Sequence, residues 1–502
     1  MSGKSVMGGG YGEYSAYTAL ELGAMVQSRQ VGVEELARAA LDAAKASNGD
    51  INAFITFSDD VAMSQARAVQ SRIDSGDIPS RLAGVPVAVK DNISARGVLT
   101  TCASLILDGY TPMYDATVVE RLRGAGTVMI GKLNMDEFAM GSTTETSAYG
   151  PARNPWDTER CPGGSSGGAA AAVAAGVAPF ALGSDTGGSI RQPAAFCGVT
   201  GHKPTYGAVS RWGLVAYGSS LDQIGPIARD ARDCAAAMTA LSGEDTRDGT
   251  SMPYVFDDSA VLRADADALK GLRFGIPREA FETGLDPSVK SLALDAVDLL
   301  SDLGASVEWF PFPMFRHAVP AYYIIASAEA ASNLSRYDGI RYGRGAAEPG
   351  LTLDEAIVRA RSEGFGREVK RRLMLGNFAL SAGYYDAYYN KALQAKTLLR
   401  GEYDSAFQRF DIIITPTAPT TAMRLGESLD DPLAMYLGDV YTVPVNLAGL
   451  PAVSLPCGFA GDGMPAGMQF IGRAFDDVGV LRAAVAYQSV TGWHKEGYHA
   501  AV

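Results

Sequence analysis

Gly163-Gly164-Ser165-Ser166-Gly167-Gly168 and, 24 residues further on, Asp185-Thr186-Gly187-Gly188-Ser189-Ile190-Arg191 are two serine clusters set in glycine-rich chain. Residues 167–176, dominated by alanine, predict a buried helix that opens directly after the first cluster. Residues 180–183 are apolar and predict a strand that leads into the second cluster. Both serine clusters are therefore expected at junctions between regular elements, where glycine-rich backbone exposes its N–H groups.

Short apolar strands alternate with helices on both sides of this stretch. Such alternation predicts an α/β fold with a mixed central β-sheet covered by helices on both faces. Residues 319–409 are predicted to be mostly helical, and the strands after them predict that the chain returns to the same sheet, so that residues 1–502 form one large domain. The expected strands are 85–89, 127–130, 180–183, 272–276, 411–414, 452–455 and 468–471, and the expected helices are two within 14–47 and those at 59–73, 115–124, 167–176, 189–196, 231–241, 287–303 and 476–489.

The chain is acidic, with 43 Lys and Arg against 56 Asp and Glu and a formal net charge of −13. Since non-specific affinity for nucleic acids comes mainly from basic side chains meeting phosphates, such a chain is not expected to hold RNA by itself. No stretch approaches 18 uncharged apolar residues, and residues 1–14 lack the apolar segment of a signal peptide. We therefore expect a cytoplasmic protein without a membrane segment.

Cysteine and histidine are few and scattered. The five cysteines never form Cys-x-x-Cys and the four histidines never form His-x-x-x-His, so neither a disulfide framework nor a metal site is expected. Cys197 lies near the second serine cluster and is an alternative nucleophile, although a cysteine in such a place is more often small core packing.

Lys90 ends the apolar run Val85-Pro86-Val87-Ala88-Val89. A serine hydroxyl is a poor nucleophile at neutral pH, and it needs a base and a binding site for the oxyanion. A lysine can be this base only as a neutral amine, so its pKa must fall from about 10.4 to roughly 7–8. Burial at the end of a strand favours the neutral form. The strand-end lysine and the two serine clusters together predict a serine amidohydrolase.

Two other motif interpretations fit less well. Residues 126–132 have the glycine and lysine spacing of a P-loop, but Leu133 replaces the hydroxyl that would bind magnesium, and the intervening residues are typical of a buried strand. Ser165 and Ser166 each lie at the centre of a Gly-x-Ser-x-Gly pattern, as in the nucleophile elbow of α/β-hydrolases. That elbow follows a strand, whereas residues 154–162 are typical of a loop, and only His494 and His499 come late enough for its histidine.

Residues 84–230 resemble the signature region of the amidase signature family. Within that family the resemblance extends, over about residues 12–495, to the A subunits of the glutamyl-tRNA(Gln)/aspartyl-tRNA(Asn) amidotransferases. The lysine and the two serines of the family have the same spacing here. The narrower match is carried by residues 134–141 (NMDEFAMG), 220–226 (SLDQIGP), 383–389 (GYYDAYY) and 444–451 (PVNLAGLP).

The resemblance implies a catalytic triad and an oxyanion hole. Ser189 would be the nucleophile, Ser165 a bridging serine that follows a cis peptide bond, and Lys90 the terminal base. The oxyanion hole would be formed by the backbone N–H groups of Thr186, Gly187, Gly188 and Ser189.

The resemblance also implies a binding site for glutamine. Arg372 would bind the α-carboxylate and Asp439 the α-ammonium group, and one fixed charge of each sign suits a zwitterionic amino acid. From the sequence alone, within Lys370-Arg371-Arg372, Arg372 is instead typical of a solvated helix face.

By the same resemblance the chain is expected to be a glutaminase that delivers ammonia within a complex with amidotransferase subunits B and C. The partner would hold the tRNA and, with ATP and magnesium, activate misacylated Glu-tRNA(Gln) or Asp-tRNA(Asn), and no cofactor is expected in this chain. One alternative is a stand-alone amidase that acts on another small amide. Another is a catalytically silent scaffold, against which the intact Lys90, Ser165 and Ser189 argue.

Overall fold

The computed structural model describes residues 14–282, 284–345, 350–427 and 432–496. Two features of the sequence analysis, the N-terminal residues 1–13 and His499, lie outside these ranges. Within them, no helix combines the length and the apolar character that crossing a bilayer requires.

The described chain contains strands β1–β11 and helices α1–α16. The strands are β1 (Phe54–Phe57), β2 (Pro86–Lys90), β3 (Val128–Leu133), β4 (Phe180–Asp185), β5 (Thr200–Lys203), β6 (Gln223–Ala228), β7 (Arg273–Pro277), β8 (Ser306–Phe310), β9 (Ile412–Pro416), β10 (Ala452–Phe459) and β11 (Pro465–Ile471). The helices are α1 (Ala19–Gln27), α2 (Val33–Ile51), α3 (Asp59–Asp74), α4 (Thr117–Gly124), α5 (Gly167–Ala174), α6 (Arg191–Phe196), α7 (Ala231–Leu241), α8 (Ser259–Leu262), α9 (Pro287–Asp302), α10 (Ala318–Asn333), α11 (Leu353–Gly364), α12 (Arg367–Leu380), α13 (Asn390–Ala406), α14 (Pro432–Leu437), α15 (Val443–Ala448) and α16 (Asp477–Val490).

All of these strands belong to one sheet, in the order β1-β3-β2-β4-β6-β5-β10-β11-β9-β7-β8. β2 is parallel to β3 and β4, and β7 is parallel to β8 and β9. The remaining neighbours pair antiparallel, so the sheet is mixed, as the sequence predicts. Strands from the C-terminal third, β9 to β11, continue the sheet beyond β5.

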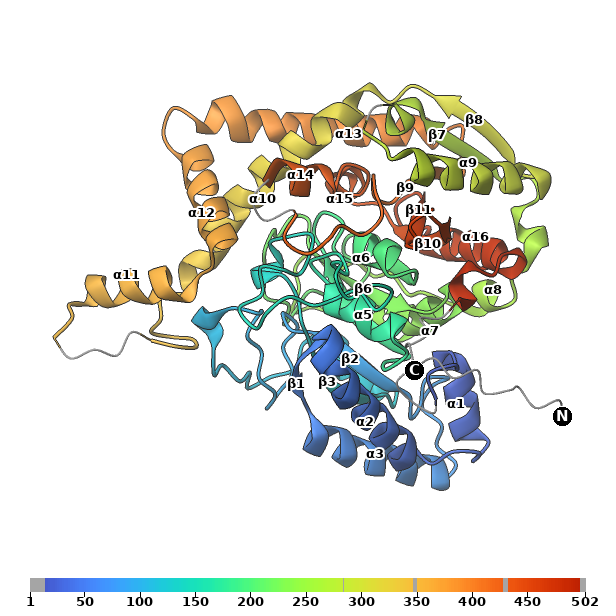
Figure 1. Cartoon of the computed structure of the whole chain (residues 1–502), viewed down its shortest axis with the longest axis horizontal. Coiled ribbons are helices and arrows are strands. Elements are labelled where there is room, and N and C mark those ends of the chain that lie inside the picture. Colours follow the sequence, from blue (N-terminus) through green and yellow to red (C-terminus); the bar gives the residue numbers. More distant parts are fainter. Residues whose placement is uncertain (1–13, 283, 346–349, 428–431, 497–502) are drawn as a thin grey trace.

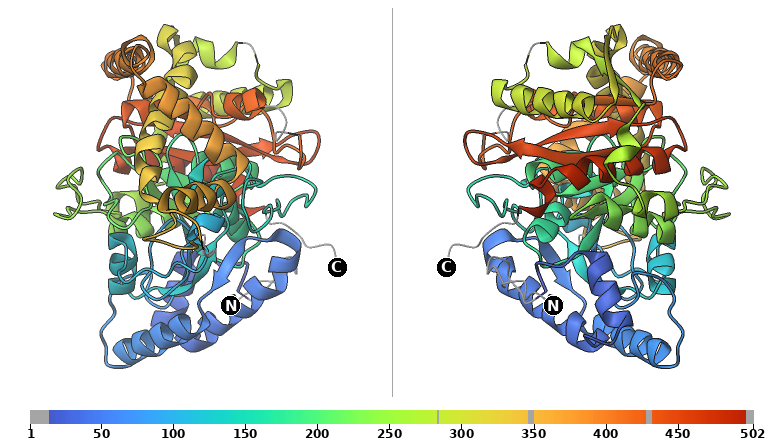
Figure 2. Two further views of the ribbon diagram at one scale, coloured as in Figure 1. Left: turned by 90° about the vertical axis from the view of Figure 1, so that its left-hand side faces the viewer. Right: turned by 90° about the vertical axis from the view of Figure 1, so that its right-hand side faces the viewer.

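Helices cover both faces of the sheet (Figures 1 and 2). α2 and α3 lie at the bottom of Figure 1 beside β1 and β3, and α1 lies to their right; α10 to α12 lie on the left of the figure, and α9 and α16 lie on its right. α3 packs on β3, whereas α9 and α16 pack on β10 and β11. The apolar side chains between these layers form one extensive buried core. The predicted fold class is confirmed.

Four strands, β1, β5, β6 and β8, were not expected from the sequence. β1 and β5 are only four residues long, which leaves little pattern to detect. β6 contains Gly225 and Pro226, residues that argue against a strand interior. β8 is an edge strand whose side chains are largely exposed, so it lacks the apolar run of a central strand.

The predicted lysine and serines meet at one edge of the sheet. Lys90 is the last residue of β2 and Asp185 the last residue of β4, and the two strands are parallel neighbours, so their carboxyl ends lie together. Ser165 and Ser166 immediately precede α5, which packs on β4 and β2. The carboxyl ends of parallel strands are where open α/β sheets usually bind ligands.

Candidate active site

Lys90 is fully buried, and its side chain contacts both serines of the first cluster. Nζ donates hydrogen bonds to Ser165 Oγ at 2.7 Å, to Ser166 Oγ at 2.8 Å and to the Ser184 carbonyl oxygen at 3.2 Å. All three contacts are uncharged. A buried amine without a carboxylate in contact is poorly stabilised as an ammonium ion.

The environment of Lys90 lowers its pKa from 10.5 to about 7. The main cause is burial, which penalises the charged amine, and the carboxylates of Asp136, Asp185 and Asp222 oppose it from a distance. A substantial fraction of the amine is therefore neutral near pH 7, as a general base requires.

Ser165 follows a cis peptide bond from Gly164, the geometry that the family resemblance implies. Gly164 is wedged against the loop that follows β3, since a Cβ atom there would lie 2.1 Å from Asp136 Oδ2 and 2.5 Å from the Thr143 nitrogen. Asp136 also receives a backbone hydrogen bond from Thr144 at 2.9 Å, and its own N–H donates to the Ser165 carbonyl at 3.3 Å. The backbone of Ser165 is thus fixed by the loop at Asp136.

Ser189 lies in the turn that joins β4 to α6 and is 7% exposed. Its carbonyl oxygen accepts the N–H of Ser166 at 3.1 Å, so the two serine clusters are in contact. Its hydroxyl makes no hydrogen bond with any residue in the described ranges. The structure therefore joins Lys90 directly to Ser165 and brings Ser189 beside the same cluster, without a hydrogen bond between the Ser165 and Ser189 hydroxyls.

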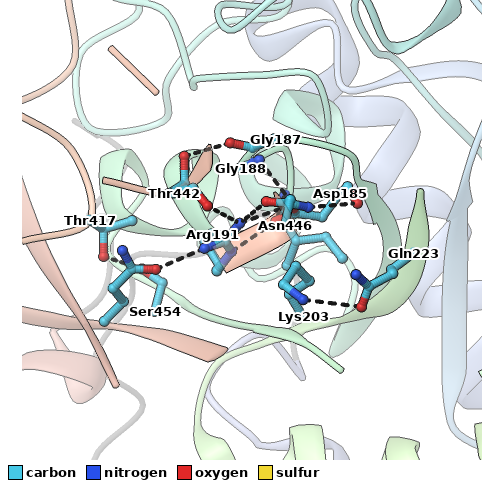
Figure 3. A network of polar contacts seen from close by, with 12 residues as sticks. Asp185, Gly187, Gly188, Arg191, Lys203, Gln223, Thr417, Thr442, Asn446 and Ser454 are labelled. Atoms are coloured by element: carbon cyan, nitrogen blue, oxygen red, sulfur yellow. Dashed lines mark hydrogen bonds and ion pairs between the residues drawn. The ribbon is translucent and has the colours of Figure 1, made fainter. Parts of the chain in front are cut away.

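A buried ion pair fixes the turn that carries Ser189 (Figure 3). Arg191 Nε lies 3.0 Å from Asp185 Oδ2, and Asn446 Nδ2 donates to Asp185 Oδ1 at 2.8 Å. Burial alone would raise the pKa of Asp185, but the Arg191 guanidinium outweighs it and lowers the pKa to about 2. Asp185 is therefore ionised throughout the neutral range and holds the turn closed.

The four predicted oxyanion-hole residues differ in how their groups are engaged. The Gly188 N–H donates to Asp185 Oδ1 at 2.9 Å, and the Thr186 hydroxyl donates to Asp222 at 2.6 Å. Within the described part of the chain, the backbone N–H groups of Thr186, Gly187 and Ser189 have no acceptor. Those three are the donors that the turn leaves open toward a ligand.

Arg372 is buried on α12, with 2% of its surface exposed, so its interpretation as part of a solvated helix face is wrong. Nε donates to Glu368 Oε1 at 2.8 Å and Nη1 to the Tyr217 hydroxyl at 2.6 Å. The guanidinium also lies 5.1–5.7 Å from the ring centroids of Tyr217, Tyr323 and Tyr436. The aromatic rings and the single carboxylate hold the planar guanidinium in a fixed orientation. They leave it able to bind a further anionic group.

Asp439 lies in the same cluster. Its Oδ2 accepts hydrogen bonds from the Ser142 hydroxyl at 2.7 Å and from the Tyr323 hydroxyl at 3.3 Å. Burial raises its pKa to about 7, although the Ser142 hydrogen bond and the charge of Arg372 oppose the shift. Tyr323 thus contacts both Arg372 and Asp439.

The cluster is linked to the Ser189 turn through Thr442. Its hydroxyl donates to the Gly187 carbonyl at 2.6 Å, and its N–H donates to the Asp439 carbonyl at 3.1 Å. One cationic and one anionic side chain, Arg372 and Asp439, are therefore part of the same buried assembly as the serines.

Several residues of this assembly were not predicted from the sequence, namely Ser142, Tyr217, Tyr323, Glu368, Asn446 and Thr442, and Ser166 was considered only as the serine of an α/β-hydrolase elbow. Glu368 could have been found, because it lies four residues before Arg372 on a predicted helical stretch, a spacing that places the two side chains together. The others come from separate elements, and only the fold brings them together.

Two alternatives from the sequence, Cys197 as the nucleophile and the P-loop, are not supported. Cys197 is buried, its thiol donates to the Pro162 carbonyl at 3.4 Å, and burial raises its pKa well above its ordinary value, so it is core packing. The P-loop-like residues form β3, where a Cβ atom on Gly131 would lie 2.5 Å from the Thr56 carbonyl of β1. Among the described residues, no group of three or more His, Cys, Asp or Glu is placed to hold a metal ion.

A model of the protein family described as Amidase matches residues 35–481, and the chain belongs to this family. Its relatives include the A subunit of the glutamyl-tRNA(Gln) amidotransferase of Agathobacter rectalis, which is 56% identical over 471 residues, covering 94% of this chain and 93% of that protein. The protein of the same name from Moorella thermoacetica is 54% identical over 479 residues, covering 95% and 97%.

Solved structures agree with this assignment. The A subunit of the glutamyl-tRNA(Gln) amidotransferase of Thermotoga maritima is 41% identical, with a TM-score of 0.78 and coverage of 95% of this chain and 96% of that one. A bacterial aryl acylamidase of the amidase signature family is 26% identical, with a TM-score of 0.83 and coverage of 95% and 97%.

Proposed function

We propose that the chain is the glutaminase component of a glutamyl-tRNA(Gln) amidotransferase. The observation that carries the proposal is Lys90, a buried amine with a pKa near 7 that lies 2.7 Å from the hydroxyl of Ser165. Relatives that match nearly the whole chain bear the name of this component. One amidase domain spanning the chain is part of the proposal, supported by a single sheet with strands from residue 54 to residue 471.

Ser189 is the nucleophile in this mechanism. Its oxygen attacks the side-chain amide carbon of glutamine, its proton passes to Ser165 Oγ, and the proton of Ser165 passes to Lys90 Nζ. The N–H groups of Thr186, Gly187 and Ser189 stabilise the oxyanion, whereas the N–H of Gly188, the fourth residue of the predicted hole, is engaged with Asp185. Losing one such donor typically costs about 10²–10³ in rate.

The relay then runs in reverse. Lys90 returns the proton through Ser165 to the leaving nitrogen, and ammonia departs as the tetrahedral intermediate collapses to a γ-glutamyl ester on Ser189. Water attacks the ester with the same relay acting as base, which gives glutamate and restores Ser189. Each proton taken up by Lys90 is released within the same half-reaction.

Arg372 and Asp439 bind the two charged ends of glutamine. The guanidinium receives the α-carboxylate, and the ionised Asp439 receives the α-ammonium group. Asp439 must be ionised to bind the ammonium ion, and its pKa is near 7. The hydrogen bonds that it accepts from Ser142 and Tyr323 favour the ionised form.

The released ammonia passes to partner subunits B and C. ATP, magnesium and most tRNA contacts belong to the partner, in keeping with the net charge of −13 on this chain. Glu-tRNA(Gln) is the principal acceptor, Asp-tRNA(Asn) is the alternative, and the complex works in the cytoplasm.

Mass spectrometry of the glutamine-treated full chain, alone and with subunits B and C, tests the proposal. We expect a γ-glutamyl adduct on the peptide that contains Ser189 and none on a Ser189→Ala variant. A chain that hydrolyses varied simple amides rapidly but forms no adduct with glutamine in either setting would show a stand-alone amidase. A chain that forms no adduct with any amide would show a silent scaffold.

A further inference from the structure

Lys90 contacts a second hydroxyl that the proposed relay does not use. Ser166 Oγ lies 2.8 Å from Nζ, almost as close as Ser165 Oγ at 2.7 Å. A neutral amine has one lone pair and can take a proton from only one of the two hydroxyls. The site must therefore contain something that selects Ser165.

The hydrogen of Ser166 is engaged elsewhere. Ser166 is fully buried, and its hydroxyl donates to the Ser184 carbonyl oxygen at 3.0 Å. The Ser184 N–H in turn donates to Ser166 Oγ at 3.3 Å. Because a hydroxyl has a single hydrogen, Ser166 faces Lys90 only as an acceptor.

The contacts of Lys90 then account for both hydrogens and the lone pair of its neutral nitrogen. The neutral amine has two hydrogens, and Ser166 Oγ and the Ser184 carbonyl accept them. The lone pair remains for the hydroxyl of Ser165. After proton transfer the ammonium ion has three hydrogens and finds the same three acceptors, so only the Lys90–Ser165 hydrogen bond reverses its direction.

We propose that Ser166 is a positioning residue that directs the lone pair of Lys90 to Ser165 and so sets the direction of the proton relay. The inference depends on the proposed function, because it assumes that Lys90 is the base. Ser166 itself exchanges no proton with the substrate.

Removing the Ser166 hydroxyl should also change the titration of Lys90. An acceptor stabilises an ammonium ion more than a neutral amine, so its loss lowers the pKa further. The other groups that act on Lys90 are Asp136, Asp185, Asp222 and the Cys102 thiol, and a Ser166 variant leaves all of them in place. The acid limb of the pH–rate profile, where the rate rises as Lys90 loses its proton, should therefore move to lower pH, even though the maximal rate falls.

The test is the rate at which an aryl sulfonyl fluoride modifies Ser189 in the full chain, measured from pH 5.5 to 9.5. For Ser166→Ala we expect a plateau rate about 10- to 100-fold below that of the unmodified sequence, as is typical when a reacting group loses its orientation. We also expect the acid limb to move by about one pH unit toward lower pH. Ser166→Cys, which keeps a side-chain acceptor although it is weaker and slightly larger, should change both quantities in the same direction and by less.

Ser454→Ala is the matched control, because Ser454 is equally buried and, among the described residues, its hydroxyl bonds only to Thr417, at 3.0 Å. Its labelling rate and acid limb should stay unchanged. A slower Ser166→Ala variant whose acid limb does not move would show a merely structural role and overturn the inference, as would an unchanged rate. Labelling of a Lys90→Met variant at the original rate would instead overturn the proposed function, because Lys90 would not be the base.

Discussion

Lys90 and Lys132 lie at the ends of neighbouring parallel strands, and both side chains are fully buried, yet their surroundings differ. Lys132 Nζ lies 3.2 Å from Asp91 Oδ1 and donates to the Thr100 hydroxyl at 2.7 Å. Lys90 contacts two hydroxyls and a carbonyl oxygen. Burial lowers the pKa of both amines, but of the two only Lys132 has a carboxylate in contact that opposes the shift.

The comparison teaches that burial alone does not make a lysine a base. A buried ammonium ion in contact with a carboxylate is part of an ion pair and contributes to structure. A buried amine in contact with neutral acceptors loses its proton more easily and can act as a base. The first contacts of the nitrogen therefore assign opposite roles to two lysines in adjacent strands.

The largest expected effect is on catalysis. Lys90→Met should reduce glutamine hydrolysis by at least about 10²–10⁴-fold, the usual contribution of a general base. Lys132→Met should keep the turnover of correctly folded molecules within about tenfold. Steady-state ammonia release, normalised to folded protein by circular dichroism, measures both, and comparable losses in the two variants would remove the distinction.

The next largest expected effect is on the free energy of unfolding, and it concerns Lys132. Lys132→Met leaves the Asp91 carboxylate buried and unpaired, which should cost about 3–5 kcal/mol in the free energy of unfolding. Lys90→Met leaves no charge behind and should be at least as stable as the unmodified sequence. Urea unfolding at pH 7.5 compares them, and a Lys90→Met variant that is the less stable of the two would contradict the account.

Arg372 is a third buried cation to compare with the two lysines, because it contacts both a carboxylate and neutral side chains. Arg372→Ala should raise the KM for glutamine by about 10- to 100-fold, because a charge-assisted hydrogen bond contributes about 1.5–3 kcal/mol. Arg371→Ala is the matched control, because Arg371 pairs with the same Glu368 at 2.6 Å from a more exposed position. Glutamine titrations of both variants decide the matter, and an unchanged KM for Arg372→Ala would defeat the assignment.

The smallest effect is the pH dependence of stability. The pKa of Lys90 in the folded protein, about 7, lies below its ordinary value of 10.5. Below pH 7 the amine is charged in both states, so the folded protein bears the full cost of burying the ion. Between pH 7 and 10.5 the unfolded chain binds more protons, so the free energy of unfolding should rise with pH by up to about 1.4 kcal/mol per unit. Urea unfolding at pH 7.5 and 8.5 should show this rise in the unmodified sequence relative to Lys90→Met, and parallel curves would contradict it.

The sequence predicts the surroundings of Lys90 better than those of Lys132. The apolar run before Lys90 identifies a buried strand end, and the glycine-rich serine clusters identify the turns around it. The ion pair of Lys132 is not predicted, because Asp91 reaches it from the end of the adjacent strand. Chain order also cannot show which of the adjacent Ser165 and Ser166 faces Lys90 as a donor, since that depends on Ser184 at the end of β4.

The central claim is that an uncharged Lys90 activates Ser189, and the rate of γ-glutamyl ester formation on Ser189 tests it most directly. In single-turnover experiments with the full chain and subunits B and C, this rate should fall about tenfold per pH unit below an apparent pKa near 7. In Lys90→Met the rate should be very low and should lack this limb. A rate that stays constant through pH 7, or a Lys90→Met variant that forms the ester at the original rate, would contradict the account.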